Sequence, residues 1–286
     1  MSTAVPAFGQ HATMRVIWIT AAAALGGFLF GYDTAVINGA VDAMRGAFGL
    51  SAAATGFAVS CALIGSAIGA WYAGPLADRY GRVPTMRVAA VLLAISALGA
   101  GLAFGVWDLI LWRVVGGIGV GVASVIAPTY IAEVSPAHVR GRLGSLQQLA
   151  IVLGIFASLL SDAYLANAAG GAAQTLWLGL DAWRWMFLVA VLPALIYGAL
   201  VFAVPESPRH LCAKGRFDDA RSVLRDVLDM RNEGALEAKL GEIRDSLRTE
   251  YRPRLSDLRG ARMGLLPIVW VGILLSVFQQ FVGINV

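Results

Sequence analysis

The chain has 286 residues and a formal net charge of +4, and only 14% of its residues are charged whereas 58% are hydrophobic. Its mean hydropathy is +0.71. This composition lies well outside the balance of a soluble domain, so it argues against a soluble enzyme and predicts a membrane protein.

Seven apolar runs are long enough to cross a bilayer as helices. A helix needs roughly 20 residues to cross about 30 Å of hydrocarbon. In chain order the runs cover residues 16–37, 55–77, 88–107, 109–132, 143–161, 185–205 and 263–286. A short polar stretch precedes the first run and no small-residue cleavage site follows it, so we interpret it as a retained span and not as a signal peptide.

Two charged residues lie inside these runs. Asp33 is the only charged residue in the run 16–37, and Arg113 is the only one in the run 109–132. An ionisable side chain at such depth costs about 2.5–3.5 kcal/mol on insertion scales, so it is retained where it faces a partner or a watery cavity. One interpretation is that each side chain reaches out of the membrane from the end of its span. The other, which we favour, is that the two face each other on a transport path.

The basic residues fall in alternate loops, which predicts the orientation of the chain. Arg15 and the loops after the second, fourth and sixth runs carry almost all of them, whereas the opposite loops carry only Arg45 and Arg184. Lys and Arg in short loops remain in the cytoplasm. We therefore predict a cytoplasmic N-terminus, and the positive net charge needs no nucleic-acid partner to explain it.

These patterns divide the chain into four parts. Residues 1–15 form a tail, 16–205 six transmembrane helices, 206–262 a cytoplasmic segment and 263–286 a seventh transmembrane helix. In the cytoplasmic segment, where acidic and basic residues are interleaved, apolar residues recur at helical spacing and predict two amphipathic helices. These residues are Ala220, Val223, Leu224 and Val227 for the first helix, and Leu236, Leu240, Ile243 and Leu247 for the second. The pattern fits equally well a linker with surface helices and a latch across the cytoplasmic face.

Glycines recur four residues apart within the runs and predict close helix packing. The pairs are Gly27 and Gly31, Gly65 and Gly69, Gly101 and Gly105, and Gly117 and Gly121. The run 116–121, GGIGVG, follows no strand and precedes no suitably spaced acid, so we interpret it as a packing face and not as a nucleotide loop. Cys61 and Cys212 are interpreted as small apolar residues, and no metal or cofactor is predicted.

Six motifs follow one another in the chain. They are GGFLFGYDTAVINGA at 26–40, GPLADRYGR at 74–82, RVVGGIGVG at 113–121, PTYIAEVSPAHVRGR at 128–142, PESPR at 205–209 and QQFVGIN at 279–285. In order and spacing they resemble the sugar porter family of the major facilitator superfamily. The resemblance implies the N-terminal six-helix half of that fold, followed by a cytoplasmic helical segment and a seventh transmembrane helix. It also implies a multi-pass protein that is not an enzyme.

The resemblance assigns Asp33 and Arg113 to proton coupling. In proton-coupled members the acid of the first span takes up the proton and the arginine of the fourth span pairs with it, whereas facilitative relatives often have a neutral residue in place of the acid. Asp33 therefore favours symport of a sugar and a proton over uniport. Protonation of Asp33 would release Arg113 and shift the population between outward-open and inward-open states, provided that the proton binds those states unequally.

Sugar contacts in this family come from polar side chains that both donate and accept hydrogen bonds. The resemblance places them at Gln148, Gln279, Gln280 and Asn285. Gln147 lies on another face of its helix, and we interpret it as structural.

A cytoplasmic gate is implied by charged residues at the inner ends of the spans. These residues are Asp78, Arg79, Arg82, Glu133, Arg140, Glu206 and Arg209. Exposed pairs contribute only about 0–1 kcal/mol each, so such a network can break readily during a transport cycle. The chain departs from the family where Val83 and Pro84 follow Arg82, and where His210 stands in place of a frequent tryptophan.

Family members have twelve spans in two halves with the substrate between them, whereas seven runs are found here. We expect that the chain is a fragment of a longer product, the alternative being a natural short form, and that it does not transport alone because the C-terminal half is required. The expected partners are a monosaccharide, a proton and membrane lipid, and the abundance of Ala, Gly and Arg favours a bacterial inner membrane. Transport of myo-inositol or another polyol, facilitative uniport, and a non-transporting sensor or decayed gene remain alternatives.

Overall fold

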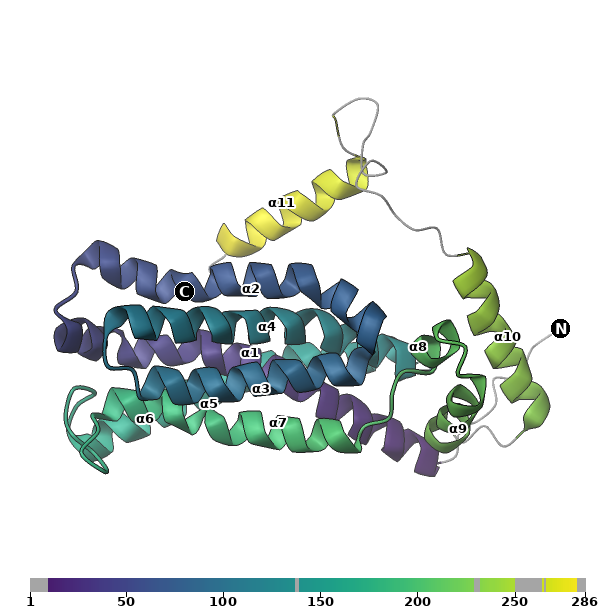
Figure 1. Ribbon diagram of the computed structural model, residues 1–286, viewed down its shortest axis with the longest axis horizontal. Coiled ribbons are helices and arrows are strands. Elements are labelled where there is room, and N and C mark those ends of the chain that lie inside the picture. Colours follow the sequence, from purple (N-terminus) through teal and green to yellow (C-terminus); the bar gives the residue numbers. More distant parts are fainter. Residues whose placement is uncertain (1–9, 137–138, 229–231, 250–263, 265, 282–286) are drawn as a thin grey trace. The chain divides into compact units, whose positions relative to one another are not determined.

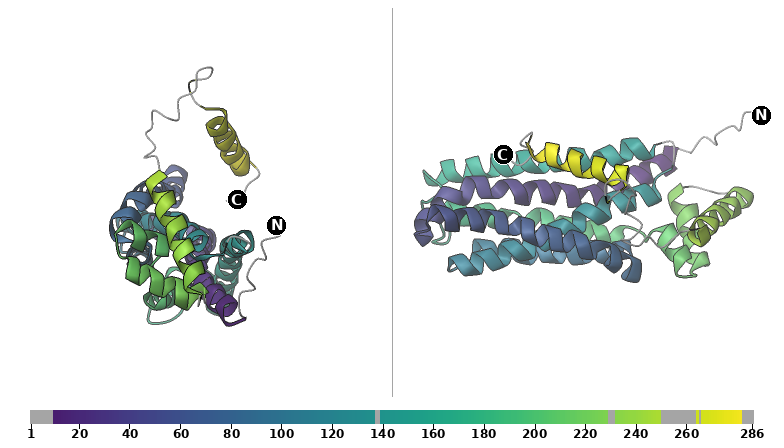
Figure 2. Two further views of the ribbon diagram at one scale, coloured as in Figure 1. Left: turned by 90° about the vertical axis from the view of Figure 1, so that its right-hand side faces the viewer. Right: turned by 90° about the horizontal axis from the view of Figure 1, so that it is seen from above.

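The computed structural model describes residues 10–136, 139–228, 232–249, 264 and 266–281. Contacts divide the chain into two compact units, Met1–Gly241 and Glu242–Val286. The first unit begins with the helices α1 (Gln10–Phe48), α2 (Ala52–Tyr80), α3 (Arg82–Gly101), α4 (Val106–Val134), α5 (Arg140–Ala169), α6 (Ala182–Val189) and α7 (Val191–Ala203). Figures 1 and 2 show them running side by side as one bundle.

Six helical segments are long and apolar enough to cross a membrane, among the residues that the structure describes. They are Met14–Phe48, Ala52–Tyr80, Arg82–Gly101, Val106–Val134, Arg140–Ala169 and Ala182–Ala203. The last joins α6 and α7, which are interrupted at Ala190. Pro193 lacks the N–H group that would bond the carbonyl of Val189, which accounts for the interruption. Each of the first six predicted spans thus corresponds to one helical segment, but the third, 88–107, runs past the end of α3 at Gly101, and the sixth, 185–205, runs past the end of α7 at Ala203.

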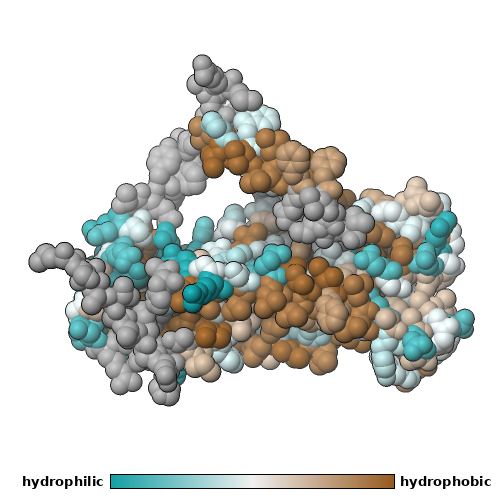
Figure 3. Space-filling view, turned by 180° about the vertical axis from the view of Figure 1, so that it is seen from behind, coloured by the Kyte–Doolittle hydropathy of each residue, from teal (hydrophilic) through white to brown (hydrophobic). Residues whose placement is uncertain are grey.

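Many large apolar side chains lie on the outside of the bundle, and many of the residues within it are small, beside larger ones such as Trp183 and Tyr197. Trp71, Phe156 and Leu192 are among many exposed apolar residues, whereas alanines dominate the buried positions. Figure 3 shows apolar side chains over much of the flank of the bundle and hydrophilic ones towards its ends. This distribution suits a bilayer, in which helices associate through close packing of small residues and not by hiding apolar surface.

Reciprocal glycine contacts hold α1 to α5 and α2 to α4. A Cβ atom on Gly31 would clash with the backbone carbonyl of Ile151, and one on Gly154 would clash with that of Phe28. In the other pair, Gly65 meets the carbonyl of Val114, while Gly117 and Gly121 meet the carbonyls of Ala62 and Ser66 in the same way. These backbones can approach only because the side chains are missing.

The prediction that Gly105 is a packing residue is wrong. No heavy atom lies within 4 Å of the place where its Cβ atom would be. Gly105 is the residue before α4, with extended backbone (φ −163°), so it lies outside the helical surface that packs.

The segment after α7 forms α8 (Pro208–Ala213), α9 (Phe217–Leu228) and α10 (Glu233–Thr249). The two predicted amphipathic helices correspond to α9 and α10. Ala220 and Leu224 are buried on α9, and Leu236 and Leu240 are buried on α10. The short helix α8 was not predicted. It begins with Ser207, whose side chain accepts a hydrogen bond from the backbone N–H of His210, and Pro208 occupies its first turn.

In the second unit, α11 (Pro267–Phe281) forms the described part of the predicted seventh span. Its 15 residues would reach about 22 Å at 1.5 Å per residue, less than the hydrocarbon thickness of about 30 Å. The predicted span continues to residue 286, outside the described residues, so it stays a prediction.

Candidate functional site

Asp33 and Arg113 meet inside the bundle, on α1 and α4. Arg113 Nη1 lies 3.1 Å from Asp33 Oδ1, and the exposed fractions of the two side chains are 3% for arginine and 21% for aspartate. The guanidinium is therefore enclosed, and the carboxylate is partly open. The interpretation in which each side chain reaches out of the membrane separately does not agree with this contact, but the role of the pair in proton coupling stays a prediction.

Arg113 is held by more than the carboxylate. Its Nη1 atom also donates to the backbone carbonyl of Asp33 at 3.2 Å, and its guanidinium carbon lies 5.8 Å from the centre of the Phe187 ring on α6. A cation over an aromatic face is stabilised by the ring quadrupole. Loss of the Asp33 charge would therefore leave Arg113 with a carbonyl and a ring as partners. Arg113 would then be released only in part, whereas the sequence suggested full release.

The predicted sugar-binding amides lie in different settings. Gln148 is exposed on α5. Its neighbour Gln147 is buried, and its Nε2 atom would lie 2.7 Å from a Cβ atom on Gly27. This contact with α1 agrees with a structural role for Gln147. Gln279 and Gln280 belong to α11, but their side chains and the whole of Asn285 lie outside the described residues.

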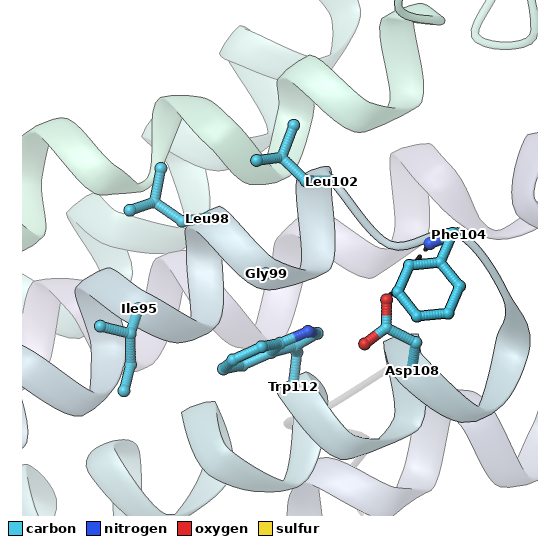
Figure 4. A pocket seen from close by; sticks show the side chains of 7 residues that line it. All are labelled: Ile95, Leu98, Gly99, Leu102, Phe104, Asp108 and Trp112. Carbon is cyan, nitrogen blue, oxygen red and sulfur yellow. Dashed lines mark hydrogen bonds between the residues drawn. The ribbon is translucent and has the colours of Figure 1, made fainter.

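A surface groove of about 360 Å³ between α3 and α4 is an unsuitable sugar site. Its lining is apolar except for Asp108 and is made of Ile95, Leu98, Gly99, Leu102, Phe104, Asp108 and Trp112 (Figure 4). The Asp108 carboxylate accepts a hydrogen bond from the backbone N–H of Phe104 at 3.2 Å. A sugar needs several donors and acceptors, which the rest of this lining does not offer.

At the other end of α3, four polar side chains form what we call the Arg82 cluster: Arg82, Glu133, Glu206 and His210. Arg82 Nη2 lies 2.9 Å from Glu133 Oε1, and Arg82 Nη1 lies 3.2 Å from His210 Nδ1. The two Glu206 oxygens accept hydrogen bonds from the backbone N–H groups of Arg82 and Val83 at 3.0 and 3.2 Å. The cluster joins the ends of α3, α4 and α7 to the beginning of α8.

Of the other predicted gate residues, Asp78 contacts this cluster. Asp78 is 3.4 Å from Arg82, but its side chain is 77% exposed. Arg79 is exposed and lies over the Tyr80 ring at 5.2 Å. Arg140 is exposed and Arg209 is half-buried. The role of all seven residues as a gate stays a prediction.

Burial of His210 lowers the pKa of its imidazole from the ordinary value of 6.5. The Glu206 carboxylate opposes this shift, and the Arg82 guanidinium adds to it. His210 is thus more readily kept neutral than a free histidine, which leaves Nδ1 able to accept a hydrogen bond from Arg82.

Three features of this arrangement escaped sequence reasoning. His210 was noted only as a departure from the family, although it belongs to the Arg82 cluster. Glu206 was predicted as a gate charge, whereas its oxygens bond the backbone at the start of α3. Asp162, one residue beyond the fifth apolar run, is buried on α5. Among the described residues, no group of three or more His, Cys, Asp and Glu could hold a metal ion.

Comparison with known proteins assigns the chain to a family. The family model described as "Sugar (and other) transporter" matches residues 19–286. The chain belongs to the sugar transporter family. With its apolar helices it is therefore a multi-pass membrane protein, and the relatives named below are transporters and not enzymes.

Members of the sugar transporter family resemble the chain along nearly all of its length. It is 58% identical over 272 residues to the glucose transport protein of Synechocystis sp. (strain ATCC 27184 / PCC 6803 / Kazusa), covering 95% of this chain and 57% of that protein. It is 39% identical over 303 residues to the D-xylose-proton symporter of Escherichia coli (strain K12), covering 97% and 60%. The chain thus spans about three fifths of the length of these relatives.

Solved structures confirm the fold as the N-terminal half of a major facilitator. The proton:xylose symporter XylE bound to 6-bromo-6-deoxy-D-glucose matches with a TM-score of 0.80 and 37% identity, over 96% of this chain and 61% of that one. A partially occluded inward-open structure of XylE from E. coli matches with a TM-score of 0.81 and 36% identity, over 94% and 64%.

Proposed function

We propose that the chain is part of a symporter that moves a monosaccharide together with a proton, with Asp33 as the proton-binding group and Arg113 as its counter-charge. The observation that carries this proposal is the ion pair itself. It joins two membrane helices at 3.1 Å, with the arginine enclosed and the acid partly open. An acid that is partly accessible and also paired with a cation can exchange a proton, and the exchange changes its ionic attraction to that cation.

The proton acts by changing the contact between α1 and α4. Protonation removes the charge of Asp33, so Arg113 keeps its bond to the Asp33 carbonyl and its place over Phe187 but loses the ionic attraction. If the proton binds one conformation more tightly than the other, the same change shifts the balance between outward-open and inward-open states. The relatives support this choice, since they include xylose-, arabinose- and galactose-proton symporters by name.

The remaining parts of the proposal follow the family resemblance. We assign sugar contacts to Gln148, Gln279, Gln280 and Asn285. We assign the closing of the inner face to Asp78, Arg79, Arg82, Glu133, Arg140, Glu206 and Arg209. The N-terminus lies in the cytoplasm, as the distribution of Lys and Arg favours, and the abundance of Ala, Gly and Arg favours a bacterial inner membrane.

The symport proposal is tested by sugar-driven proton movement in cells that express the complete gene. Addition of a transported monosaccharide is expected to make the weakly buffered medium more alkaline, because the proton enters with the sugar. Asp33→Asn is expected to abolish the alkalinisation. Asp42→Asn is the matched control, since Asp42 is an exposed acid on the same helix, and it should leave the proton signal unchanged.

The outcomes separate the alternatives. Sugar uptake without proton movement in the unaltered protein would replace symport by uniport. Sugar binding without uptake would indicate a sensor. Uptake of myo-inositol or another polyol in place of aldoses would change the substrate class and leave the proton role of Asp33 intact.

We further propose that residues 1–286 alone do not transport. The resemblance implies a sugar site between two halves, and this chain spans about three fifths of its relatives. Proton-dependent sugar uptake by vesicles that contain only the 286-residue chain would overturn this proposal.

A further inference from the structure

A second acid lies buried in the membrane bundle, on α5. Asp162 is 4% exposed, and neither of its carboxyl oxygens has a hydrogen-bond partner among the described residues. Ser158, one helical turn earlier, is 0% exposed, and its hydroxyl also lacks a hydrogen-bond partner there. Residues four apart share one face of a helix, so two unsatisfied polar side chains lie on the same stripe of α5.

This stripe lies against α1. A Cβ atom on Gly39 would lie 2.7 Å from the Asp162 Cβ atom and 2.8 Å from Asp162 Oδ2. The carboxyl group is thus pressed against the backbone of α1, at a position that only glycine leaves open. Nearby, the Tyr32 and Ser161 hydroxyls lie 2.7 Å apart and connect the same two helices. Asp162 is therefore enclosed in the seam where α1 packs on α5, whereas the Asp33 carboxylate is partly open.

No cation faces Asp162 from the helices packed on α5, as far as the structure describes them. On α1, Tyr32 is the ionisable group that interacts with it electrostatically, and Asp42 is exposed. On α4, Arg113 is engaged with Asp33. On α6, Arg184 donates to the backbone carbonyls of Gly101 and Ala103.

A buried carboxylate without a cation or donors is far costlier than the neutral acid. A metal ion would need several oxygen ligands around it, whereas a proton needs one oxygen. We propose that Asp162 is a second proton-binding site, held in its protonated form while α1 and α5 are packed together at Gly39.

Protonation of Asp162 is then linked to the packing of the seam. Gly39 lies six positions after Asp33, about 9 Å along the axis of α1 at 1.5 Å per residue, so Asp162 contacts α1 at a place distinct from Asp33. Release of the Asp162 proton requires water or a donor to reach the carboxylate, and therefore separation of α1 from α5 near Gly39. This inference needs only the local geometry and does not depend on sugar transport.

Infrared spectroscopy of the purified protein in lipid nanodiscs tests the proposal. A protonated carboxylic acid gives a C=O stretching band apart from those of amides and carboxylates. At neutral pH the unaltered protein is expected to show this band, to shift it on labelling with 13C-aspartate, and to lose it in Asp162→Asn. Asp42→Asn is the control that should keep the band, and Asp33→Asn should keep the part that belongs to Asp162.

Absence of an aspartic acid band from the unaltered protein at neutral pH would overturn the proposal. So would an unchanged band in Asp162→Asn. If Asp162→Asn fails to fold, the labelled Asp33→Asn protein still decides the question. An aspartic acid band that survives in Asp33→Asn comes from another buried aspartate. Loss of the band in Asp33→Asn refutes the assignment to Asp162. Asp162→Glu, labelled with 13C-aspartate only, is expected to keep an acid band that no longer shifts.

Discussion

Glu206 accepts a hydrogen bond from the backbone N–H of Arg82 at 3.0 Å, although 124 residues separate the two in the chain. The first N–H groups of a helix have no acceptor within the helix. The residue before α3 is Gly81, with φ +111°, and it has no side chain to supply one. Glu206 therefore caps the N-terminus of α3, as an adjacent serine or aspartate caps other helices. It also connects the end of α7 to the start of α3.

Glu206→Ala is expected to lower the stability of the bundle by about 1–3 kcal/mol, the range for leaving buried donors unsatisfied. Thermal unfolding of the purified protein in detergent measures the change. Glu206→Gln retains an acceptor oxygen and should lose less. Asp78→Ala, which removes a largely exposed acid near the same arginine, should change stability by less than about 0.5 kcal/mol. Equal losses in the Asp78 and Glu206 variants would refute this role of Glu206.

Gly31→Ala is expected to disrupt the packing of α1 on α5, because its Cβ atom would meet the backbone carbonyl of Ile151 and a backbone cannot rotate away. Overpacking of this kind costs about 1–3 kcal/mol or more. Gly46→Ala on the same helix has nothing within 4 Å of the new atom. It should be neutral or stabilising by up to about 1 kcal/mol, since alanine favours a helix. Denaturation midpoints of both variants in one detergent provide the comparison.

His210 is expected to make stability depend on pH. Burial lowers its pKa below 6.5 in the folded protein, whereas the unfolded chain keeps the ordinary value. The unfolded state therefore binds the proton first, and stability falls as the pH drops from 6.5 towards the lower folded pKa. His210→Gln cannot titrate and should show a smaller loss of melting temperature across that window. Identical pH profiles for the two proteins would contradict the prediction.

Arg184→Ala is expected to destabilise the end of α3. Arg184 Nη1 donates to the carbonyls of Gly101 and Ala103 at 3.2 and 2.5 Å, and these oxygens lie at a helix end without helical donors. Loss of such charged hydrogen bonds costs about 1.5–3 kcal/mol. Arg45→Ala, at an exposed position on α1, is the control. Faster hydrogen exchange confined to residues around 98–103 in the Arg184 variant would show where the loss acts.

The helices of the bundle could be predicted from the sequence because apolar runs of about 20 residues leave few alternatives in a membrane. The amphipathic helices α9 and α10 followed from apolar residues at helical spacing. The short helix α8 did not, because six residues carry too little periodic pattern. The interruption between α6 and α7 was also missed, although Pro193 marks it.

The Asp33–Arg113 contact could be anticipated because both residues are conspicuous by their charge within apolar runs. Asp162 was missed for the opposite reason, since it stands at the end of a run and looks like the boundary of a span. Its burial depends on Gly39, on another helix, and no pattern within α5 shows that pairing. The bonds from Glu206 to α3 were likewise beyond reach, because residues so distant in the chain are brought together only by the tertiary fold.

The glycine contacts make α1 and α5 one closely packed helix pair, and α2 and α4 another. Asp33 belongs to the first pair and Arg113 to the second. The ion pair therefore lies between the two glycine-packed helix pairs and not within either of them. If Asp33 takes up a proton, as we propose, the attraction between the two pairs weakens while the glycine contacts within each pair stay the same.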